Sequence, residues 1–311
     1  MALVLGIDGG GTKTKCAVTR DGVVIGSATT GASNLVRGTD ADVRSALHAA
    51  IRSACDTANV TPGEIEAACI GAAGAARESI ANRVHAMVTE ILRCPVEVVG
   101  DMQVAYDAAM HGGPGVIVIS GTGSIAYGRN ERDESARAGG WGSIISDEGS
   151  GYWIGRNAVA AVFRAFDNGR STGLTRHIMD AWKTFTRDEL IAKANTNPQP
   201  NFAELAPAVF QSALEGDPMS QELLSDAGGE LAKLVKVVLR RLFPVGQAVQ
   251  VAAIGGVFTN SIILYKAFEN SLRAERQEAV VRVLTDDPVD GALFRAERLI
   301  SDAIRSIGEQ R

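Results

Sequence analysis

Two glycine-rich turns, each between two apolar stretches, constrain the fold of this chain more than any other feature. The first turn lies at residues 9–11 within the segment 3–19, and the second lies at residues 121–123 within the segment 116–128. A glycine turn that joins two short apolar runs is typical of an antiparallel pair of strands. The two halves of the chain therefore open alike, in a weak repeat of structure rather than of sequence.

The segments around the first turn predict an α/β domain. The spacing of apolar residues predicts strands over 3–8, 15–19, 23–28, 67–72 and 96–99 and helices over 40–58, 78–93 and 103–111. This order, β-β-β-α-β-α-β-α, is typical of a mixed sheet covered by helices. Thr39 or Asp40 is the expected N-cap of the first helix.

The second half predicts a related domain with more helix. Its expected elements are strands over 116–120, 124–128, 250–254 and 280–285 and helices within 151–243, from about 260, and over 289–306. A length of 311 residues suits two domains of ordinary size. Gly112-Gly-Pro-Gly115 is the expected junction, which gives domains over residues 1–114 and 115–311.

Composition limits the classes of partner that the chain is expected to bind. A net charge of −5 gives no reason to expect nucleic acid or an anionic membrane. No targeting segment and no apolar run of membrane-spanning length is found, so we expect a cytoplasmic location. The four cysteines form no CxxC pair, which favours buried free thiols over a metal site.

The first glycine turn has the chemistry of a phosphate site. Asp8 precedes three glycines and Thr12, so several backbone N–H groups can surround phosphate oxygens while the threonine adds a hydroxyl. Asp8 could hold Mg²⁺ through water, because Mg²⁺ keeps much of its hydration. The turn is neither a GxxxxGK[ST] nor a GxGxxG motif. The alternative is a hairpin without catalytic meaning.

Two further glycine turns extend this pattern. Residues 120–124 form a second possible phosphate turn, for which a chance hairpin is the alternative. Residues 255–260 join a strand to a helix, and the side-chain-free backbone of the glycine turn at 255–256 suits a purine ring; a tight βα turn is the alternative. Together the turns indicate a polyphosphate ligand.

Asp101 follows a strand and precedes a helix, a position that forms the functional rim of α/β sheets. A carboxylate there can accept the proton of an attacking hydroxyl, as phosphoryl transfer to an alcohol requires. The alternative is an N-cap, because aspartate is favoured there.

The segment 139–155 combines glycines, two tryptophans and the adjacent acids Asp147 and Glu148. Carboxylates and aromatic rings in a bent loop suit a sugar, whose hydroxyls need acceptors and whose C–H face needs a ring. The alternative makes Asp147 the N-cap of the next helix and Trp141 and Trp153 core residues. We favour the core for Trp153 and ligand contact for Asp147.

These stretches together resemble the N-acetylglucosamine kinase branch of the BadF/BadG/BcrA/BcrD ATPase group, in the sugar kinase, heat-shock-70 and actin superfamily. The resemblance covers nearly the whole chain. It rests, in order, on GIDGGGTKT, SNLVRGTD, GDMQVAYDAA, GVIVISGTGSIAYG, GGWGSIISDEGSGYWIG, Gly216-Asp-Pro218 before a long helix, and AIGGVFTNS.

The resemblance implies two actin-like (ribonuclease H-like) domains with βββαβαβα cores around a central cleft, and a last helix that crosses back to the first domain. It implies ATP and Mg²⁺ as cofactors, an amino sugar with its 6-hydroxyl as acceptor, Asp101 as base and a homodimer. The implied nucleotide contacts are Gly10, Gly11, Thr12, Lys13, Gly121, Thr122, Gly123, Gly228, Gly256 and Asn260. The implied sugar contacts are Asn34, Gly74, Asp101, Ser124, Gly140, Trp141, Gly142 and Asp147.

Two questions stay open at this point. Residues 72–75 are poorer in hydroxyls than this loop usually is in the group, and members of the group accept N-acetylglucosamine, glucosamine or N-acetylmuramic acid. Other members are ATP-driven activators of 2-hydroxyacyl-CoA dehydratase systems, which hold an iron–sulfur cluster through thiolates between subunits. No cysteine follows the glycine turns in such a context, which favours the kinase.

Overall fold

The computed structural model describes residues 2–35 and 38–308, with side chains described as far as residue 302. Val36 and Arg37, which belong to the stretch SNLVRGTD, lie outside the described residues, as do Met1 and residues 309–311. The chain divides into two compact units. Unit 1 consists of Met1–Gly113 and Asp286–Arg311, and unit 2 of Pro114–Thr285.

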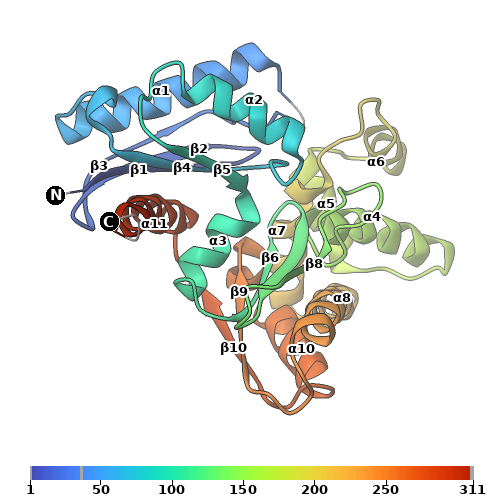
Figure 1. The fold of residues 1–311 in the computed structure, drawn as a ribbon. Coiled ribbons are helices and arrows are strands. Elements are labelled where there is room, and N and C mark those ends of the chain that lie inside the picture. The colour runs from blue at the N-terminus through green and yellow to red at the C-terminus, as the bar shows by residue number, and fades with distance from the viewer. Residues whose placement is uncertain (1, 36–37, 309–311) are drawn as a thin grey trace. The chain divides into compact units, whose positions relative to one another are not determined.

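Unit 1 is built on a five-stranded sheet of order β3-β2-β1-β4-β5 (Figure 1). Its strands are β1 (Leu3–Gly9), β2 (Thr14–Arg20), β3 (Val23–Thr30), β4 (Ala67–Ala72) and β5 (Val96–Gly100). The first three strands pair antiparallel, whereas β4 and β5 run parallel to β1. The predicted order of strands and helices in this half is confirmed.

Helices cover both faces of this sheet (Figure 1). They are α1 (Asp40–Ala58), α2 (Glu78–Val88), α3 (Asp101–Met110) and α11 (Pro288–Gly308). Because side chains alternate along a strand, Leu5 and Ile7 pack with Ile51 of α1, while Val4 packs with Leu293 of α11. Thr39 is the N-cap of α1, since its hydroxyl accepts from the N–H of Asp42.

Unit 2 contains a second five-stranded sheet, of order β10-β9-β6-β7-β8. Its strands are β6 (Gly115–Ser120), β7 (Ser124–Arg129), β8 (Ser135–Gly139), β9 (Val249–Ile254) and β10 (Ala279–Leu284). Its helices are α4 (Gly151–Asp167), α5 (Gly173–Trp182), α6 (Arg187–Ala194), α7 (Ala206–Leu214), α8 (Pro218–Leu242), α9 (Gly256–Asn260) and α10 (Ile262–Arg273). Strand β8 was not predicted from the spacing of apolar residues, although the βββαβαβα core that the resemblance implies has a third strand at this place.

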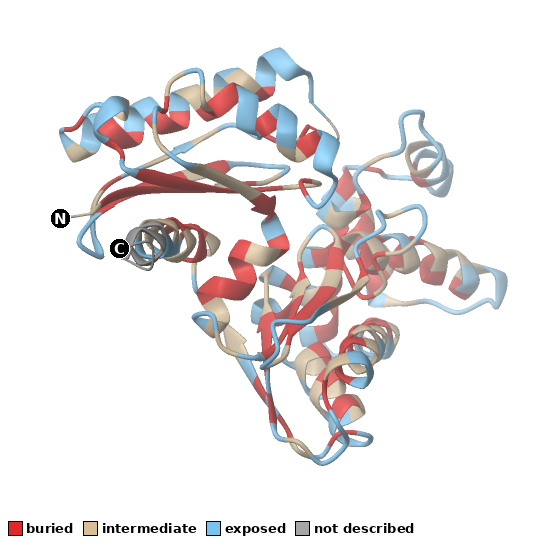
Figure 2. Ribbon diagram, viewed as in Figure 1, coloured by how far each residue is buried: buried red, intermediate tan, exposed pale blue. Residues whose placement is uncertain are grey.

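Parallel strands place their carboxyl ends at one edge of each sheet. In unit 1 these strands are β1, β4 and β5, and in unit 2 they are β6, β9 and β10. Strand β4 is buried along its whole length, as Figure 2 shows. Loops at such carboxyl edges commonly bind ligands in α/β proteins. Of the helices described, none is long and apolar enough to cross a membrane.

Candidate functional site

The carboxyl edge of the sheet in unit 1 brings three predicted residues together. Asp8 lies at the end of β1, Gly74 lies in the loop after β4, and Asp101 directly follows β5. The N–H of Ala73 donates to the carbonyl of Gly9 at 3.0 Å, which ties the loop after β4 to the first glycine turn. The sheet topology therefore gathers residues from three separate stretches of sequence.

The first glycine turn is held by the loop after β3. The N–H of Ser33 donates to the carbonyl of Gly10 at 3.2 Å. A Cβ on Gly9 would lie 2.6 Å from Oγ of Ser33 and 3.2 Å from the carbonyl oxygen of Gly71, so a larger residue there would displace the Ser33 hydroxyl. A Cβ on Gly11 would lie 3.6 Å from Nδ2 of Asn34, which places this predicted sugar contact beside the turn. Gly11, Thr12 and Lys13 are exposed.

Asp8 is surrounded by charge. Burial, with the neighbouring carboxylates of Asp101 and Asp287, raises the pKa of Asp8 to about 6, while Lys13 and Lys15 oppose the rise. Lys15 forms an ion pair with Asp287. Neither Lys15 nor Asp287 is among the predicted site residues. The register of the hairpin sets Lys15 opposite Asp8, so this register could have indicated Lys15. Asp287 lies 272 residues after Lys15 in the sequence, and no local pattern indicates their contact.

Asp101 is the first residue of α3. Gly100 occupies the N-cap position, so the N-cap alternative for Asp101 is wrong. The carboxylate accepts a hydrogen bond from the N–H of Met102 at 2.9 Å. The residue Asp101 as a whole is exposed. Partial burial of its carboxyl nevertheless raises the pKa of that group, while hydrogen bonds from the N–H groups of Met102 and of Asp101 itself oppose the rise. A carboxylate in these surroundings can accept a proton.

The glycine turn of unit 2 is fixed by the start of α4. The N–H of Gly151 donates to the carbonyl of Gly121 at 2.8 Å, and the N–H of Tyr152 donates to the carbonyl of Thr122 at 3.2 Å. The hydroxyl of Ser124 donates to the carbonyl of Glu148 at 2.8 Å. Ser124 thus fixes the acidic loop to the turn, and its side chain is buried.

Asp147 lies against this turn. A Cβ on Gly123 would lie 2.9 Å from a carboxylate oxygen of Asp147. The aspartate is buried and has a φ of 70°, a conformation that non-glycine residues adopt rarely and often at functional sites. Ser150, not Asp147, caps α4 by accepting from the N–H of Trp153, so the N-cap alternative for Asp147 is wrong.

The two tryptophans of this segment have different surroundings. Trp141 is 60% exposed, and the guanidinium of Arg137 lies 4.0 Å from the centre of its ring. Gly140 and Gly142, on either side, have positive φ. Trp153 is half-buried against the core of unit 2, as we expected. Trp141 is therefore a ring available to a ligand, while Trp153 belongs to the core.

The turn after β9 packs closely against the end of β6, next to the glycine turn of the same unit. Gly255 has a φ of 108°, and a Cβ there would lie 2.3 Å from the carbonyl oxygen of Ser120. Asn260 donates through Nδ2 to the carbonyl of Gly256 at 2.7 Å. Gly228 is buried in α8, where a Cβ would lie 2.4 Å from the carbonyl oxygen of Leu264 in α10. Close helix packing by itself accounts for glycine at position 228.

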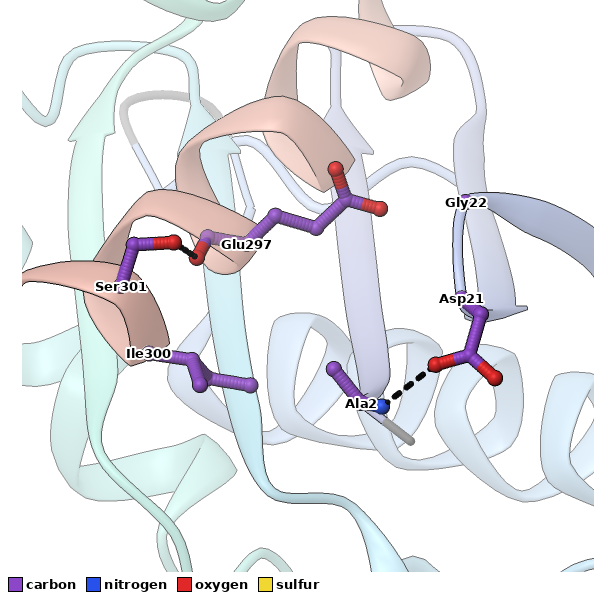
Figure 3. Close-up of a pocket in the computed structure, with 6 residues that line it drawn as sticks. All are labelled: Ala2, Asp21, Gly22, Glu297, Ile300 and Ser301. Atoms are coloured by element: carbon purple, nitrogen blue, oxygen red, sulfur yellow. Dashed lines mark hydrogen bonds between the residues drawn. The ribbon is translucent and has the colours of Figure 1, made fainter. Parts of the chain in front are cut away.

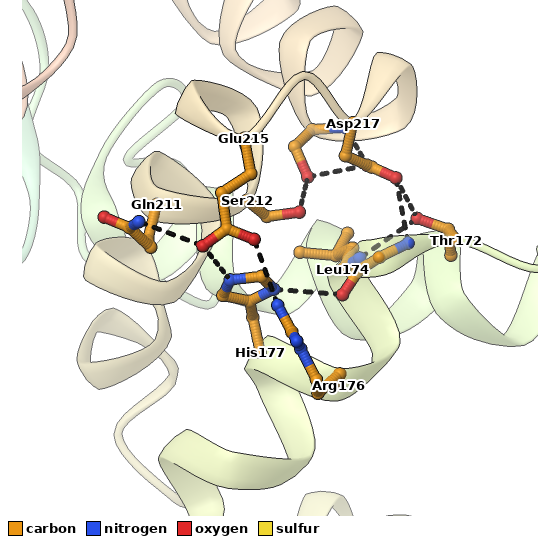
Figure 4. A network of polar contacts seen from close by, with 10 residues as sticks. Thr172, Leu174, Arg176, His177, Gln211, Ser212, Glu215 and Asp217 are labelled. Atoms are coloured by element: carbon orange, nitrogen blue, oxygen red, sulfur yellow. Dashed lines mark hydrogen bonds and ion pairs between the residues drawn. The ribbon is translucent and has the colours of Figure 1, made fainter.

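The Gly216-Asp-Pro218 stretch is a helix start (Figure 4). Asp217 is the N-cap of α8, accepting from the N–H of Ser220 at 2.9 Å. The same carboxylate accepts from the hydroxyl of Thr172 at 2.6 Å. Nearby, His177 faces Glu215 at 3.2 Å. This network joins α5, α7 and α8 and includes none of the predicted site residues.

A cavity of about 410 Å³ lies elsewhere in unit 1 (Figure 3). Its lining comes from the β2–β3 turn, the start of the chain and α11, with Asp21 and Glu297 as its charged groups. It contains no predicted site residue. Within the part of the chain that the structure describes, no group of three or more His, Cys, Asp or Glu side chains is arranged to hold a metal ion.

Two mixed sheets, each with a glycine turn after its first strand, define an α/β protein with the fold of actin-like sugar kinases. The chain belongs to the BadF/BadG/BcrA/BcrD ATPase family, whose model matches residues 5–293. The predicted family and fold class are thereby confirmed.

The chain is also similar to individual proteins over nearly its whole length. It is 35% identical to the N-acetylmuramic acid/N-acetylglucosamine kinase of Clostridium acetobutylicum, over 95% of this chain and 98% of that protein. It is 31% identical to the N-acetyl-D-glucosamine kinase of Dictyostelium discoideum, over 94% and 97%. A solved structure from Chromobacterium violaceum, assigned to N-acetylglucosamine kinases, matches with 26% identity and a TM-score of 0.75, over 94% and 98%.

Proposed function

We propose that the protein is an ATP-dependent amino-sugar kinase that phosphorylates the 6-hydroxyl of N-acetylglucosamine, with Asp101 as the general base. The observation that carries this proposal is the meeting of Asp101, Asp8 and the first glycine turn at one sheet edge. The relatives named above, at 31% and 35% identity, support the amino-sugar substrate.

Asp101 accepts the proton of the acceptor hydroxyl as that oxygen attacks the γ-phosphorus. Its hydrogen bond from the N–H of Met102 holds the carboxylate at the start of α3. The raised pKa keeps the carboxylate more basic than an ordinary aspartate, which favours proton transfer. Exclusion of water from the reacting groups prevents water from competing as acceptor.

The proposed nucleotide contacts lie in the glycine turns of each unit, taken separately. Backbone N–H groups of the turns neutralise the charge that develops on the transferred phosphoryl group. Those of Gly10 and Gly121 already donate to the carbonyls of Lys13 and Gly123, so this role falls to the other residues of the turns. The proposed contacts are Gly10, Gly11, Thr12 and Lys13 in unit 1 and Gly121, Thr122, Gly123, Gly228, Gly256 and Asn260 in unit 2. Thr12, Lys13 and Thr122 present exposed side chains, as this role requires. Gly228 would act only through the shape of the backbone.

Asp8 fits a magnesium ion. Its carboxylate lies near two others, those of Asp101 and Asp287, and their repulsion is what a divalent cation relieves. One carboxylate is enough, because Mg²⁺ is commonly bound by one or two carboxylates, water and substrate phosphates. When bound, the ion supplies positive charge to the phosphate oxygens. Lys15, held by Asp287, supplies further positive charge beside Asp8.

In unit 2, Trp141 offers its ring to the amino sugar. The other proposed sugar contacts are Asn34 and Gly74 in unit 1 and Ser124, Gly140, Gly142 and Asp147 in unit 2. Ser124 already donates its hydroxyl hydrogen to Glu148, so it can only accept from the sugar. Glucosamine and N-acetylmuramic acid are the other candidate substrates. The homodimer and the cytoplasmic location remain predictions.

The alternative function is that of an ATP-driven activator with an iron–sulfur cluster. Such a cluster needs exposed thiolates. Cys16, Cys55 and Cys69 are buried, and burial raises the pKa of each thiol. Cys94 is half-buried, and burial raises its pKa as well. The cysteines therefore favour the kinase.

The test is ADP release from Mg·ATP with N-acetylglucosamine, glucosamine, N-acetylmuramic acid or glucose as acceptor. We expect release that depends on an amino sugar and a product phosphorylated at O6. Asp101→Asn should lower turnover by a factor of about 10³ or more, since proton transfer and alignment are both lost, while Mg·ATP still binds. ATP hydrolysis independent of sugar, together with a brown chromophore, would replace the kinase by the activator.

A further inference from the structure

We propose that Arg295 is a positioning residue for Asp101, which sets the place of the catalytic carboxylate by joining the two elements on either side of it. The inference rests on the proposed function, in which Asp101 is the base. Arg295 lies on α11, far along the chain from β5 and α3, and does not contact the reacting groups.

The guanidinium of Arg295 bridges the strand and the helix that flank Asp101. Its Nε donates to Glu97 on β5 at 2.9 Å, and its Nη2 donates to the other carboxylate oxygen of Glu97 at 2.5 Å. Its Nη1 donates to Asp107 on α3 at 2.6 Å. One planar group thus fixes both partners at once, which a lysine could not do.

This bridge is buried on the side of Asp107, whereas the side chain of Glu97 is 30% exposed. The side chain of Arg295 is 15% exposed and that of Asp107 is fully buried. The paired carboxylates raise the pKa of Arg295, although burial opposes them, so the charge is retained. A buried ion pair often adds little net stability, and in some proteins it instead specifies one arrangement of the elements that it joins. Here those elements are the end of β5 and the body of α3.

The first turn of α3 is fixed by shape as well. A Cβ on Gly291 of α11 would lie 1.9 Å from the carbonyl oxygen of Val104, and a Cβ on Gly71 of β4 would lie 2.3 Å from a methyl carbon of Val104. Val104 is therefore enclosed between a helix and a strand, one turn after Asp101. With Arg295 at Asp107, α3 has little freedom to slide or rotate.

A base works only within narrow geometry. Displacement of a reacting group by about 1 Å can cost on the order of 100-fold in rate. Since α3 begins at Asp101, a shift of this helix relative to β5 moves the carboxylate directly. The consequence is a loss of turnover without a comparable loss of nucleotide binding.

The test compares Arg295→Gln with Arg298→Gln in the full-length protein. Arg298 lies on the same helix and is exposed. We expect Arg295→Gln to lower kcat on the order of 10- to 100-fold and to change the KM for Mg·ATP by less than about threefold. Arg298→Gln should leave both constants unchanged. If Arg295→Gln does not fold, Arg295→Lys serves in its place, because it keeps one of the two links.

Ile51→Ala controls for destabilisation alone. Ile51 is fully buried on α1, which covers the other face of the sheet. At a temperature well below both melting transitions, Ile51→Ala should keep normal kcat even when its melting temperature is as low as that of the arginine variant. An equal loss of kcat in Ile51→Ala would overturn the inference.

A double-mutant cycle identifies the residue through which Arg295 acts. In the Asp101→Asn background, Arg295→Gln should cause no further loss of turnover, because the group that it positions is gone. Additive losses would overturn the inference and leave the kinase proposal standing. Full turnover by Asp101→Asn alone would instead overturn the assignment of the base, and the inference with it.

Discussion

Gly123 and the carboxylate of Asp147 are packed in direct contact, so that a single methyl group at position 123 would lie 2.9 Å from an oxygen of Asp147. The contact joins the glycine turn at 121–123, a proposed phosphate turn, to the loop with the proposed sugar contacts. If both proposals hold, the glycine at position 123 determines where the Asp147 carboxylate lies relative to the sugar.

Gly123→Ala should therefore affect the sugar. The added methyl displaces the Asp147 carboxylate, and we expect the KM for N-acetylglucosamine to rise about 10-fold or more, the loss expected when a charged hydrogen bond is removed. Steady-state kinetics with each substrate varied separately check this. The matched control is Gly121→Ala in the same turn, where a Cβ meets no atom within 4 Å. An unchanged sugar KM in Gly123→Ala would contradict the prediction.

Asp8 should lower the stability of the fold at neutral pH. Its pKa of about 6 lies above the ordinary carboxyl value of about 3.9, so between these values the folded protein holds a proton that the unfolded chain has lost. The free energy of unfolding therefore falls as pH rises through this window. Asp8→Asn should raise it by about 2 kcal/mol at pH 7.5 and by much less at pH 4.

Urea unfolding with EDTA, at both pH values, measures this effect of Asp8→Asn. If Asp8→Asn stabilises the protein as much at pH 4 as at pH 7.5, the negative charge of Asp8 is not the cause of the stabilisation. The same variant should lose turnover with Mg·ATP, because the removed carboxylate is the proposed magnesium ligand.

The neighbouring glycines 255 and 256 should respond differently to alanine. Gly255→Ala places a methyl on the carbonyl of Ser120 and requires a positive φ, so we expect a loss of at least about 2 kcal/mol in stability. Gly256→Ala meets only the amide of Asn260 at 3.8 Å and should fold normally. If Gly256 borders the adenosine, its alanine variant raises the KM for ATP alone. Equal melting temperatures for the two variants would refute the packing argument.

Asp217→Ala should destabilise unit 2 in a pH-dependent way. Burial opposes ionisation, but hydrogen bonds from Thr172, Ser220 and Gly173 outweigh it and lower the pKa of Asp217. The stabilisation is therefore present above the ordinary carboxyl pKa and is lost as pH falls through the lowered value. We expect a cost of about 1–2 kcal/mol at pH 7, as for a lost N-cap, and a smaller cost near pH 3.

Thermal or urea unfolding of Asp217→Ala across this pH range gives the comparison. Asp226→Ala, an exposed change on the same helix, should have little effect at either pH. A cost for Asp217→Ala that does not change with pH would assign the effect to packing rather than to the charge.

The fold could be predicted from the sequence wherever apolar periodicity was strong. Helix α1 and the strands around both glycine turns were predicted because their buried positions recur at the helical or strand period. Strand β8 was not predicted, because Ser135–Gly139 consists of small and charged residues and is set by its pairing with β7. Such a strand forms because it pairs with a neighbouring strand, not because its own residues favour β structure.

The site was only partly predictable. Asp8 and Asp101 could be identified because each ends a strand of its own, and strand ends meet at a sheet edge. The N-cap alternatives for Asp101 and Asp147 were wrong by one and three positions, since helix boundaries depend on local geometry that propensity does not fix. Arg295 and Asp287 carried no sequence signal, because their contacts are made across nearly the whole chain.

The last helix also determines when unit 1 can be completed during synthesis. Leu293 of α11 packs with Val4 of β1, and Arg295 completes the pairing of Asp107. The ribosome makes α11 only after the whole of unit 2, so the nascent chain carries an open apolar face on its first sheet until then. Unit 2 is continuous in sequence, so all of its strands and helices are synthesised before α11. The position of Asp101, the proposed base, therefore becomes fixed last, although this residue is encoded in the first third of the chain.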